Sequence, residues 1–233
     1  YDMGEAGLLR MIGLLEDSPL YYGGSGTDIR TAGKPVTVTV NGLKIAFLFY
    51  NSTGFQYCAA ENKTGYSCLD HNDFEKYIGT LKRDIEKIKD ADIKIVSFHW
   101  GDNYKSSPTD AQIRFAHTAI DNGIDVILGH SAHIFHGIEI YKNKPVIYDM
   151  GDLLVDKYDD WDTRSFLYYL SFSKKGFSKI ELVPVYMPNS QIRVAEGFLA
   201  EEIFRRMSEL SASFGTEFKV ENGKMILEIN SSK

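Results

Sequence analysis

Half of the histidines in this 233-residue chain lie close together at the end of an apolar stretch. His130, His133 and His136 fall within "LGHSAHIFHG", and His99 ends another apolar stretch, "IKIVSF". Neutral imidazoles are the commonest metal ligands in proteins. Two ions held about 3.5 to 4 Å apart can activate a bridging water for hydrolysis. The pattern therefore predicts a site for divalent metal ions with His99, His130 and His133 as ligands.

Other polar residues near these histidines have two interpretations each. Asp149 and Asp152 follow the apolar stretch "PVIY", where they either orient the imidazoles or cap a turn. His136 is expected to support a ligand or to be structural. His71, at the foot of a helix, and His117, within one, are expected to bond loop or neighbouring groups.

A few residues could line a substrate pocket. Trp100, Asp102 and Tyr104 follow His99, although aromatic residues at a sheet edge more often serve packing. Gln112 could reach an anionic substrate from the start of the next helix, or lie on a solvated helix face. The segment "GGSG" at 23–26 lacks the lysine and the following helix of a phosphate loop, so it is expected to be a flexible turn.

The elements that position the histidines form a strand, helix and strand unit. Residues 73–91 have apolar side chains at helical spacing, and the apolar strand 92–101 follows. A helix over 107–123, opened by Ser-Pro and closed by glycine, leads into a second apolar strand at 124–130. Parallel strands end at one edge of a sheet, so His99 and His130 are expected to emerge together.

The other segments predict an α/β fold with antiparallel additions. An amphipathic helix spans 5–17, and an Asn-Gly turn at 41–42 joins two strands within 35–50. Later hairpins are expected within 137–151, 165–187 and 218–229, with a helix between at 195–215. No linker rich in Pro, Gly or Ser interrupts the chain, so 1–233 is expected to be a single domain.

Composition limits the possible partners. The formal net charge of −6 disfavours nucleic acid, which requires a concentrated basic surface. The longest apolar runs are far shorter than the roughly 20 residues that span a bilayer. Cys58 and Cys68 form a disulfide in an oxidising compartment or remain two free thiols.

The stretch from 97 to 156 resembles the poly-γ-glutamate capsule biosynthesis proteins of the CapA type, and the resemblance extends over nearly the whole chain. The motifs that carry it are His-Trp-Gly at 99–101, Tyr104, Pro108, Gln112, the segment 121–130, His133, Gly-Ile-Glu at 137–139 and Gly-Asp-Leu at 151–153. The sequence departs from the family pattern at Asp102-Asn103, at Ser131 and at Asp152, where the family usually has asparagine.

This resemblance implies a calcineurin-like metallophosphatase fold, a β-sandwich flanked by helices. It also implies divalent ions, two in the family's pattern and Mn, Fe or Zn in identity, with His99, His130 and His133 as the ligands from this part of the protein. The remaining ligands would belong to an N-terminal segment that these residues lack, supplied by an N-terminal fragment or a separate chain. The implied setting is outside the cytoplasmic membrane, beside membrane capsule-synthase subunits, through an N-terminal anchor absent from this sequence.

Three functions follow as alternatives. The leading one is a CapA-like protein of capsule or poly-γ-glutamate assembly that retains a metal-dependent phosphoesterase or amide-ligase-associated site. The second is a non-catalytic scaffold that binds polymer or synthase subunits through the same cleft. The third is a metal-dependent phosphodiesterase with an unrelated small substrate, because one fold serves many reactions.

Overall fold

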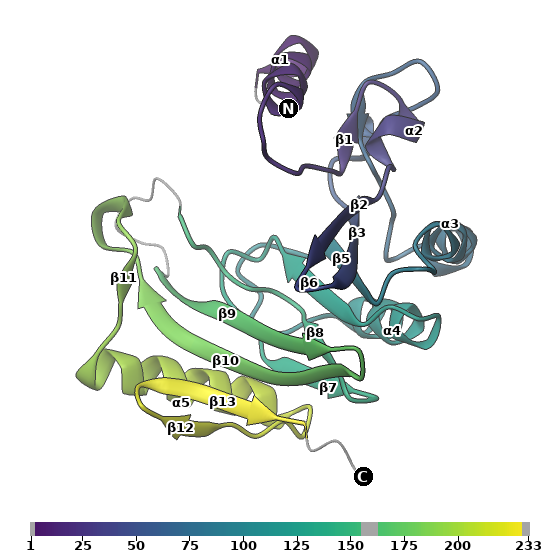
Figure 1. Ribbon diagram of the computed structural model, residues 1–233. Coiled ribbons are helices and arrows are strands. Elements are labelled where there is room, and N and C mark those ends of the chain that lie inside the picture. Colours follow the sequence, from purple (N-terminus) through teal and green to yellow (C-terminus); the bar gives the residue numbers. More distant parts are fainter. Residues whose placement is uncertain (1–2, 155–162, 230–233) are drawn as a thin grey trace.

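A six-stranded mixed sheet forms the centre of the molecule (Figure 1). The computed structural model describes residues 3–154 and 163–229. The order of the strands is β2-β3-β5-β6-β8-β7, in which β3, β5, β6 and β8 are parallel, whereas β2 and β7 lie antiparallel to their neighbours. The bounds are β2 Val36–Val40, β3 Leu43–Asn51, β5 Ile93–His99, β6 Val126–His130, β7 Ile138–Tyr141 and β8 Lys144–Ile147.

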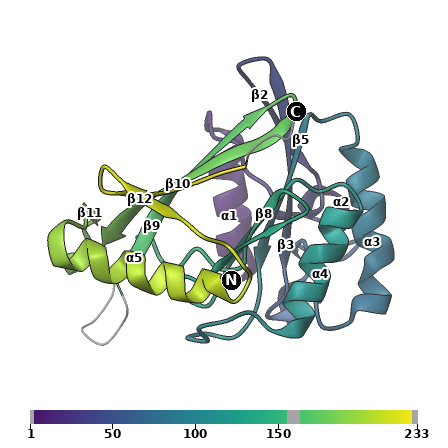
Figure 2. The same cartoon turned by 90° about the horizontal axis from the view of Figure 1, so that it is seen from below.

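Helices α3 (Phe74–Lys87) and α4 (Asp110–Asp121) cover one face of this sheet (Figure 2). Their apolar stripes bury Leu81 and Phe115 against Phe98 of β5. The strands and helices predicted over 73–130 are confirmed. Helical periodicity identified the helices, which are buried on one face, and the Ser-Pro pair marked the start of α4. Continuous apolar runs identified the strands, which are buried on both faces.

A second sheet lies beside the first. It contains β9 (Arg164–Ser173), β10 (Gly176–Tyr186), β11 (Arg193–Val194), β12 (Lys219–Glu221) and β13 (Lys224–Glu228), all paired antiparallel. Helix α5 (Gly197–Ala212) packs against β10 and β7, and a short 3₁₀ helix covers Pro188–Ser190. Leu170 and Phe172 of β9 pack on Ile93, Ile95 and Val126 of the first sheet. The predicted mixed α/β class, with sheets flanked by helices, is confirmed.

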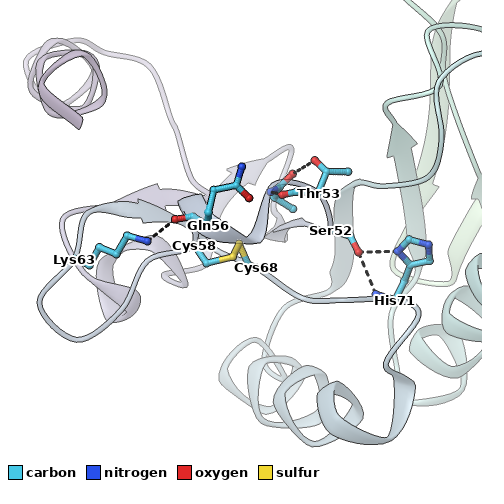
Figure 3. The surroundings of a disulfide bond; sticks show 8 residues. Ser52, Thr53, Gln56, Cys58, Lys63, Cys68 and His71 are labelled. Carbon is cyan, nitrogen blue, oxygen red and sulfur yellow. Dashed lines mark hydrogen bonds between the residues drawn. A yellow bond between two sulfur atoms is a disulfide. The ribbon is translucent and has the colours of Figure 1, made fainter. Parts of the chain in front are cut away.

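The N-terminal elements extend away from the two sheets (Figure 1). They are α1 (Gly4–Glu16), β1 (Ser25–Gly26), α2 (Ile29–Ala32), a 3₁₀ turn (Phe55–Tyr57) and β4 (Gly65–Tyr66). Strand β1 pairs antiparallel with β4, and a disulfide joins Cys58 to Cys68 (Figure 3). The disulfide, one of the two alternatives from the sequence, therefore closes the loop next to β4. Within the described residues, no helix is long and apolar enough to cross a membrane.

Candidate functional site

Three polar residues are aligned at the carboxyl ends of three neighbouring parallel strands. Asn51 of β3 lies in register with His99 of β5, and His99 lies in register with His130 of β6. The imidazoles of His99 and His130 meet with their Nδ1 atoms 3.1 Å apart. The predicted convergence of these two rings is thus present, because the strand, helix and strand unit brings both strands to one edge.

The two imidazoles are neutral at pH 7. Burial, with a smaller contribution from the neighbouring His99, lowers the pKa of His130 to about 4. Burial also lowers the pKa of His99, with a smaller contribution from His133. At their contact one Nδ1 donates a proton and the other accepts it, and Ser97 Oγ lies 3.3 Å from His130 Nε2. Neutral rings of this kind can act as metal ligands or as proton acceptors.

Asp152 and Asp149, for which the sequence left two interpretations, have different roles. The Asp152 carboxylate contacts His133 Nδ1 at 3.0 and 3.3 Å, so it orients that ring. Asp149 instead accepts backbone N–H groups of Ala132 at 2.6 Å and Gly151 at 2.9 Å, so it fixes the turn. The orienting interpretation therefore applies to Asp152, and the capping interpretation to Asp149.

The loop after His99 is tied to the loop after His130. The Tyr104 ring stacks on the His133 ring with centroids 5.7 Å apart, and the Tyr104 N–H donates to the Ala132 carbonyl. Tyr104 is half exposed and has φ of 60°, a left-handed conformation that is uncommon outside glycine. Asp102 of the same loop is exposed.

Two predicted pocket residues lie in the interior. Trp100 is fully buried and donates from Nε1 to the Tyr148 carbonyl, so it packs the core. Gln112 is only 2% exposed, and it forms a capping box with Thr109 at the start of α4. The solvated helix face that the sequence offered for Gln112 is wrong, because this side chain closes the helix end from inside.

The other histidines are held by ordinary polar contacts. His136 Nε2 donates to the Lys105 carbonyl at 2.7 Å, and the ring is buried. His71 Nδ1 lies 2.7 Å from the Ser52 hydroxyl, which also accepts the His71 N–H (Figure 3). His117 Nε2 lies 2.8 Å from Glu139. These contacts agree with the structural roles expected for His71 and His117.

A hollow of about 1010 Å³ opens beside the paired imidazoles, and we call it the histidine hollow. Its lining includes imidazole and hydroxyl groups as well as aromatic rings and glycine backbone. Its lining comprises Gly23, Gly24, Ser25, Phe49, Tyr50, Asn51, Thr53, Gly54, Tyr57, Tyr66, Ser97, His99, His130 and His133. The volume is ample for a small-molecule ligand.

Gly23 and Gly24 of "GGSG" line the histidine hollow. A Cβ atom on Gly23 would lie 2.6 Å from the Phe49 ring, and one on Gly24 would lie 2.9 Å from Phe49 Cβ. Only residues without side chains fit so close to Phe49. The expected turn is wrong for the second half of this segment, because Ser25 and Gly26 form strand β1, while Gly23 and Gly24 pack against Phe49.

Some lining residues escaped the sequence analysis. Asn51 follows the apolar stretch "IAFLFY" as His99 and His130 follow theirs, and that shared position could have identified it. Its amide donates to the Thr53 carbonyl, and its Oδ1 accepts from the Thr53 hydroxyl. Tyr57 and Tyr66 gave no such signal, because they belong to a short 3₁₀ turn and the two-residue strand β4 next to the disulfide.

The spacing of the paired imidazoles can be compared with that of two ligands on one metal ion. Two ligand nitrogens on one Zn²⁺, each about 2.0 to 2.1 Å from the ion, lie roughly 3.3 Å apart in tetrahedral geometry. The 3.1 Å between the Nδ1 atoms of His99 and His130 is close to that spacing. However, no three His, Cys, Asp or Glu side chains gather for one ion within 3–154 and 163–229. The described residues alone do not complete the site.

The chain is similar to several curated proteins. It is 29% identical to the PGA biosynthesis protein CapA of Bacillus subtilis over 99% of this chain and 60% of that protein. It is 24% identical to the capsule biosynthesis protein CapA of Bacillus anthracis, over 98% of this chain and 56% of that protein. A Mycobacterium tuberculosis protein named "probable polyglutamine synthesis accessory protein" is 26% identical to the chain, over 92% of this chain and 60% of that protein.

These relatives are longer than the chain, which spans roughly three fifths of their length. A family model described as "Bacterial capsule synthesis protein PGA_cap" matches residues 1–157, which contain both strands of the paired imidazoles as well as His133 and Asp152. The match covers well over half of the 233 residues. The chain therefore belongs to the PGA_cap family of bacterial capsule synthesis proteins.

Proposed function

We propose that this protein assists the assembly of a capsule or poly-glutamate polymer, and that the histidine hollow is its working site. The observation that carries the proposal is the alignment of His99 and His130 at adjacent strand ends, with Nδ1 atoms 3.1 Å apart beside a large hollow. The names of the Bacillus and Mycobacterium relatives support the biological setting.

The hollow would hold one or two divalent ions, Mn, Fe or Zn, through His99 and His130. His133, whose ring Asp152 orients, is the third candidate ligand. Carboxylates that orient metal-bound imidazoles in this way are common in metal sites. The ligands still needed would come from an N-terminal fragment of the complete protein or from a separate chain. When bound, such an ion supplies a Lewis acid and lowers the pKa of coordinated water.

The residues of this chain would contribute binding and orientation. The aromatic wall formed by Phe49, Tyr57 and Tyr66 offers apolar contact to the part of a substrate next to the imidazoles. The Asn51 and Thr53 groups beside it offer hydrogen bonds. Ser97 would select the tautomer of His130 through its 3.3 Å contact with Nε2.

The proposed location is outside the cytoplasmic membrane, next to the membrane subunits of the polymer synthase. The Cys58–Cys68 disulfide supports an oxidising compartment, since such bonds rarely persist in the cytoplasm. Attachment to the membrane would rely on a segment outside these 233 residues.

The test is complementation of a deletion strain with the complete gene, measuring surface polymer per cell. His99→Ala combined with His130→Ala is expected to abolish the polymer. His117→Gln, which removes an imidazole on α4 away from the hollow, serves as the matched control and is expected to restore it. Equal protein levels are verified by immunoblot. Full polymer from the double variant would refute the proposed role of the hollow.

A further inference from the structure

Two loops next to the histidine hollow hold their backbone in uncommon conformations. Within 3–154 and 163–229, residues other than glycine adopt positive φ in the turns between paired strands and in the 3₁₀ helix Pro188–Ser190, with three exceptions. These are Tyr104 (φ 60°), Ser131 (φ 141°) and His133 (φ 62°), which follow strands β5 and β6. Such conformations are unfavourable for residues with side chains and persist only where surrounding contacts impose them. Their concentration at one end of the sheet indicates a functional constraint on these loops.

The two loops, residues 101–107 and 131–136, are bonded to each other along their length. The contacts are Trp100 N–H to the His130 carbonyl (3.0 Å), Ser131 Oγ to the Gly101 carbonyl (3.3 Å), Tyr104 N–H to the Ala132 carbonyl (2.8 Å) and His136 Nε2 to the Lys105 carbonyl (2.7 Å). Hydrogen bonds therefore act before, at and after Tyr104. They fix the backbone position from which the Tyr104 ring projects toward residues 131–136.

The ring of His133 is held from two directions. Its Nδ1 lies 3.0 and 3.3 Å from the carboxylate oxygens of Asp152, so Nδ1 donates the proton and the neutral ring has its lone pair on Nε2. The Tyr104 ring lies against its face, with centroids 5.7 Å apart and planes inclined by 28°. A hydrogen bond at one nitrogen still allows the plane of the ring to turn. A second ring against its face opposes that turn.

Tyr104 can affect the hollow only through His133. The His133 side chain is 30% exposed and belongs to the lining of the hollow, whereas Tyr104 is outside that lining. Tyr104 is also 47% exposed, so it adds little apolar area to the core. The stack on His133 is therefore the contact by which Tyr104 can influence a ligand in the hollow.

We propose that Tyr104 is a positioning residue, whose ring fixes the plane of the His133 imidazole so that Asp152 keeps the Nδ1 proton and Nε2 presents its lone pair to the hollow. The effect on the His133 tautomer is a property of this chain alone. The effect on metal binding rests on the proposed function, in which His133 is the third candidate ligand. Removing a group that orients a metal ligand commonly weakens metal affinity by about 10- to 100-fold.

The first measurement reads the His133 tautomer in the complete protein without metal. Side-chain ¹H–¹⁵N NMR near pH 8, where histidine side chains are neutral, distinguishes a proton on Nδ1 from one on Nε2. We expect the Nδ1 tautomer in the wild type and in Tyr104→Phe, which keeps the ring, and a mixture of both tautomers in Tyr104→Ala. The wild-type tautomer in Tyr104→Ala, or a mixture in Tyr104→Phe as well, would overturn the proposal.

The second measurement is the Zn²⁺ affinity of the complete protein, obtained by competition with a chromogenic chelator. Tyr104→Ala is expected to bind Zn²⁺ about tenfold more weakly than the wild type. Tyr104→Phe is expected to bind as the wild type does. The same is expected of the matched control Tyr169→Ala, which removes a tyrosine of similar exposure (53%) from β9, outside the lining of the hollow.

The outcomes separate this inference from the proposed function. Equal Zn²⁺ affinity of the wild type and Tyr104→Ala would overturn the positioning role and leave the metal site intact. A wild-type protein that binds no Zn²⁺, Mn²⁺ or Fe²⁺ would refute the metal site of the proposed function, and the tautomer measurement would then decide the role of Tyr104 by itself.

Discussion

At the scale of single residues, the site depends on how burial sets the charge of each group. Burial keeps the imidazoles of His99 and His130 neutral, which leaves nitrogen lone pairs available. The carboxylate of Asp149 is also buried, at 1% exposure, although two backbone N–H groups bond to it. Burial is the larger of the two effects, because the pKa of Asp149 is raised to about 6 although the two N–H bonds act to lower it.

This shift gives the protein a specific dependence on pH. Because the folded pKa of Asp149 lies above the unfolded value of about 4, its stabilising contribution is full below pH 4 and is lost as pH rises through 6. We expect the stability advantage of wild type over Asp149→Asn to fall by about 3 kcal/mol between pH 4 and pH 7. Urea unfolding of both proteins at each pH, in the presence of chelator, measures this difference in the free energy of unfolding.

The matched control for this prediction is Asp110→Asn, at an exposed position in the first turn of α4. The pH dependence of its difference from wild type is subtracted from that of Asp149→Asn, and the remainder is assigned to the buried carboxyl group. No remaining pH dependence would show that the Asp149 carboxyl group titrates alike in the folded and unfolded protein, contrary to the burial argument.

Sequence reasoning succeeded for residues whose position along an element is informative. His99 and His130 each end an apolar strand, so their convergence followed from the parallel arrangement. The roles of Asp149 and Asp152 could not be separated, because both follow one strand and only the turn geometry directs one to the backbone and the other to His133. Gln112 was misjudged because a capping box can turn a polar side chain inward.

At the scale of elements, the helices and hairpins were predictable and the hollow's aromatic wall was not. Periodicity identified α3 and α4, and the Asn-Gly pairs at 41–42 and 222–223 marked turns that require positive φ. The wall depends on contacts between segments far apart in sequence. Strand β1 pairs with β4, and Gly23 and Gly24 press on Phe49, and no local pattern encodes either contact.

The glycine contact yields a prediction about this wall. Gly24 has φ of 88° and a Cβ there would lie 2.9 Å from Phe49 Cβ, so Gly24→Ala is expected to lower the free energy of unfolding by about 1 to 3 kcal/mol. Gly13→Ala, inside α1 with no atom within 4 Å, is expected to stabilise the protein by about 0.5 to 1 kcal/mol. Chemical denaturation compares the two.

Should Gly24→Ala prove as stable as wild type, Phe49 would be free to move away and the wall would not be rigid. If Gly13→Ala were also destabilised, the loss in Gly24→Ala could not be assigned to the contact with Phe49. Opposite changes in the free energy of unfolding of the two variants identify that contact as the cause.

At the scale of the whole molecule, family membership and the geometry of the hollow point to the same region. The family match over residues 1–157 includes the first sheet and the hollow, while the second sheet and α5 complete the packing. The sequence could indicate the family and the fold class from motifs and periodicity. It could not indicate how close the candidate ligand side chains lie to one another, since that depends on the folded structure.

The most direct test of the central claim is the metal content of the complete protein, purified without chelator and measured by inductively coupled plasma mass spectrometry. We predict stoichiometric Mn, Fe or Zn in the wild type and in His117→Gln, and loss of that metal in both His99→Ala and His130→Ala. Retention of full metal by both of the latter variants, or a wild-type protein without stoichiometric metal, would contradict the account.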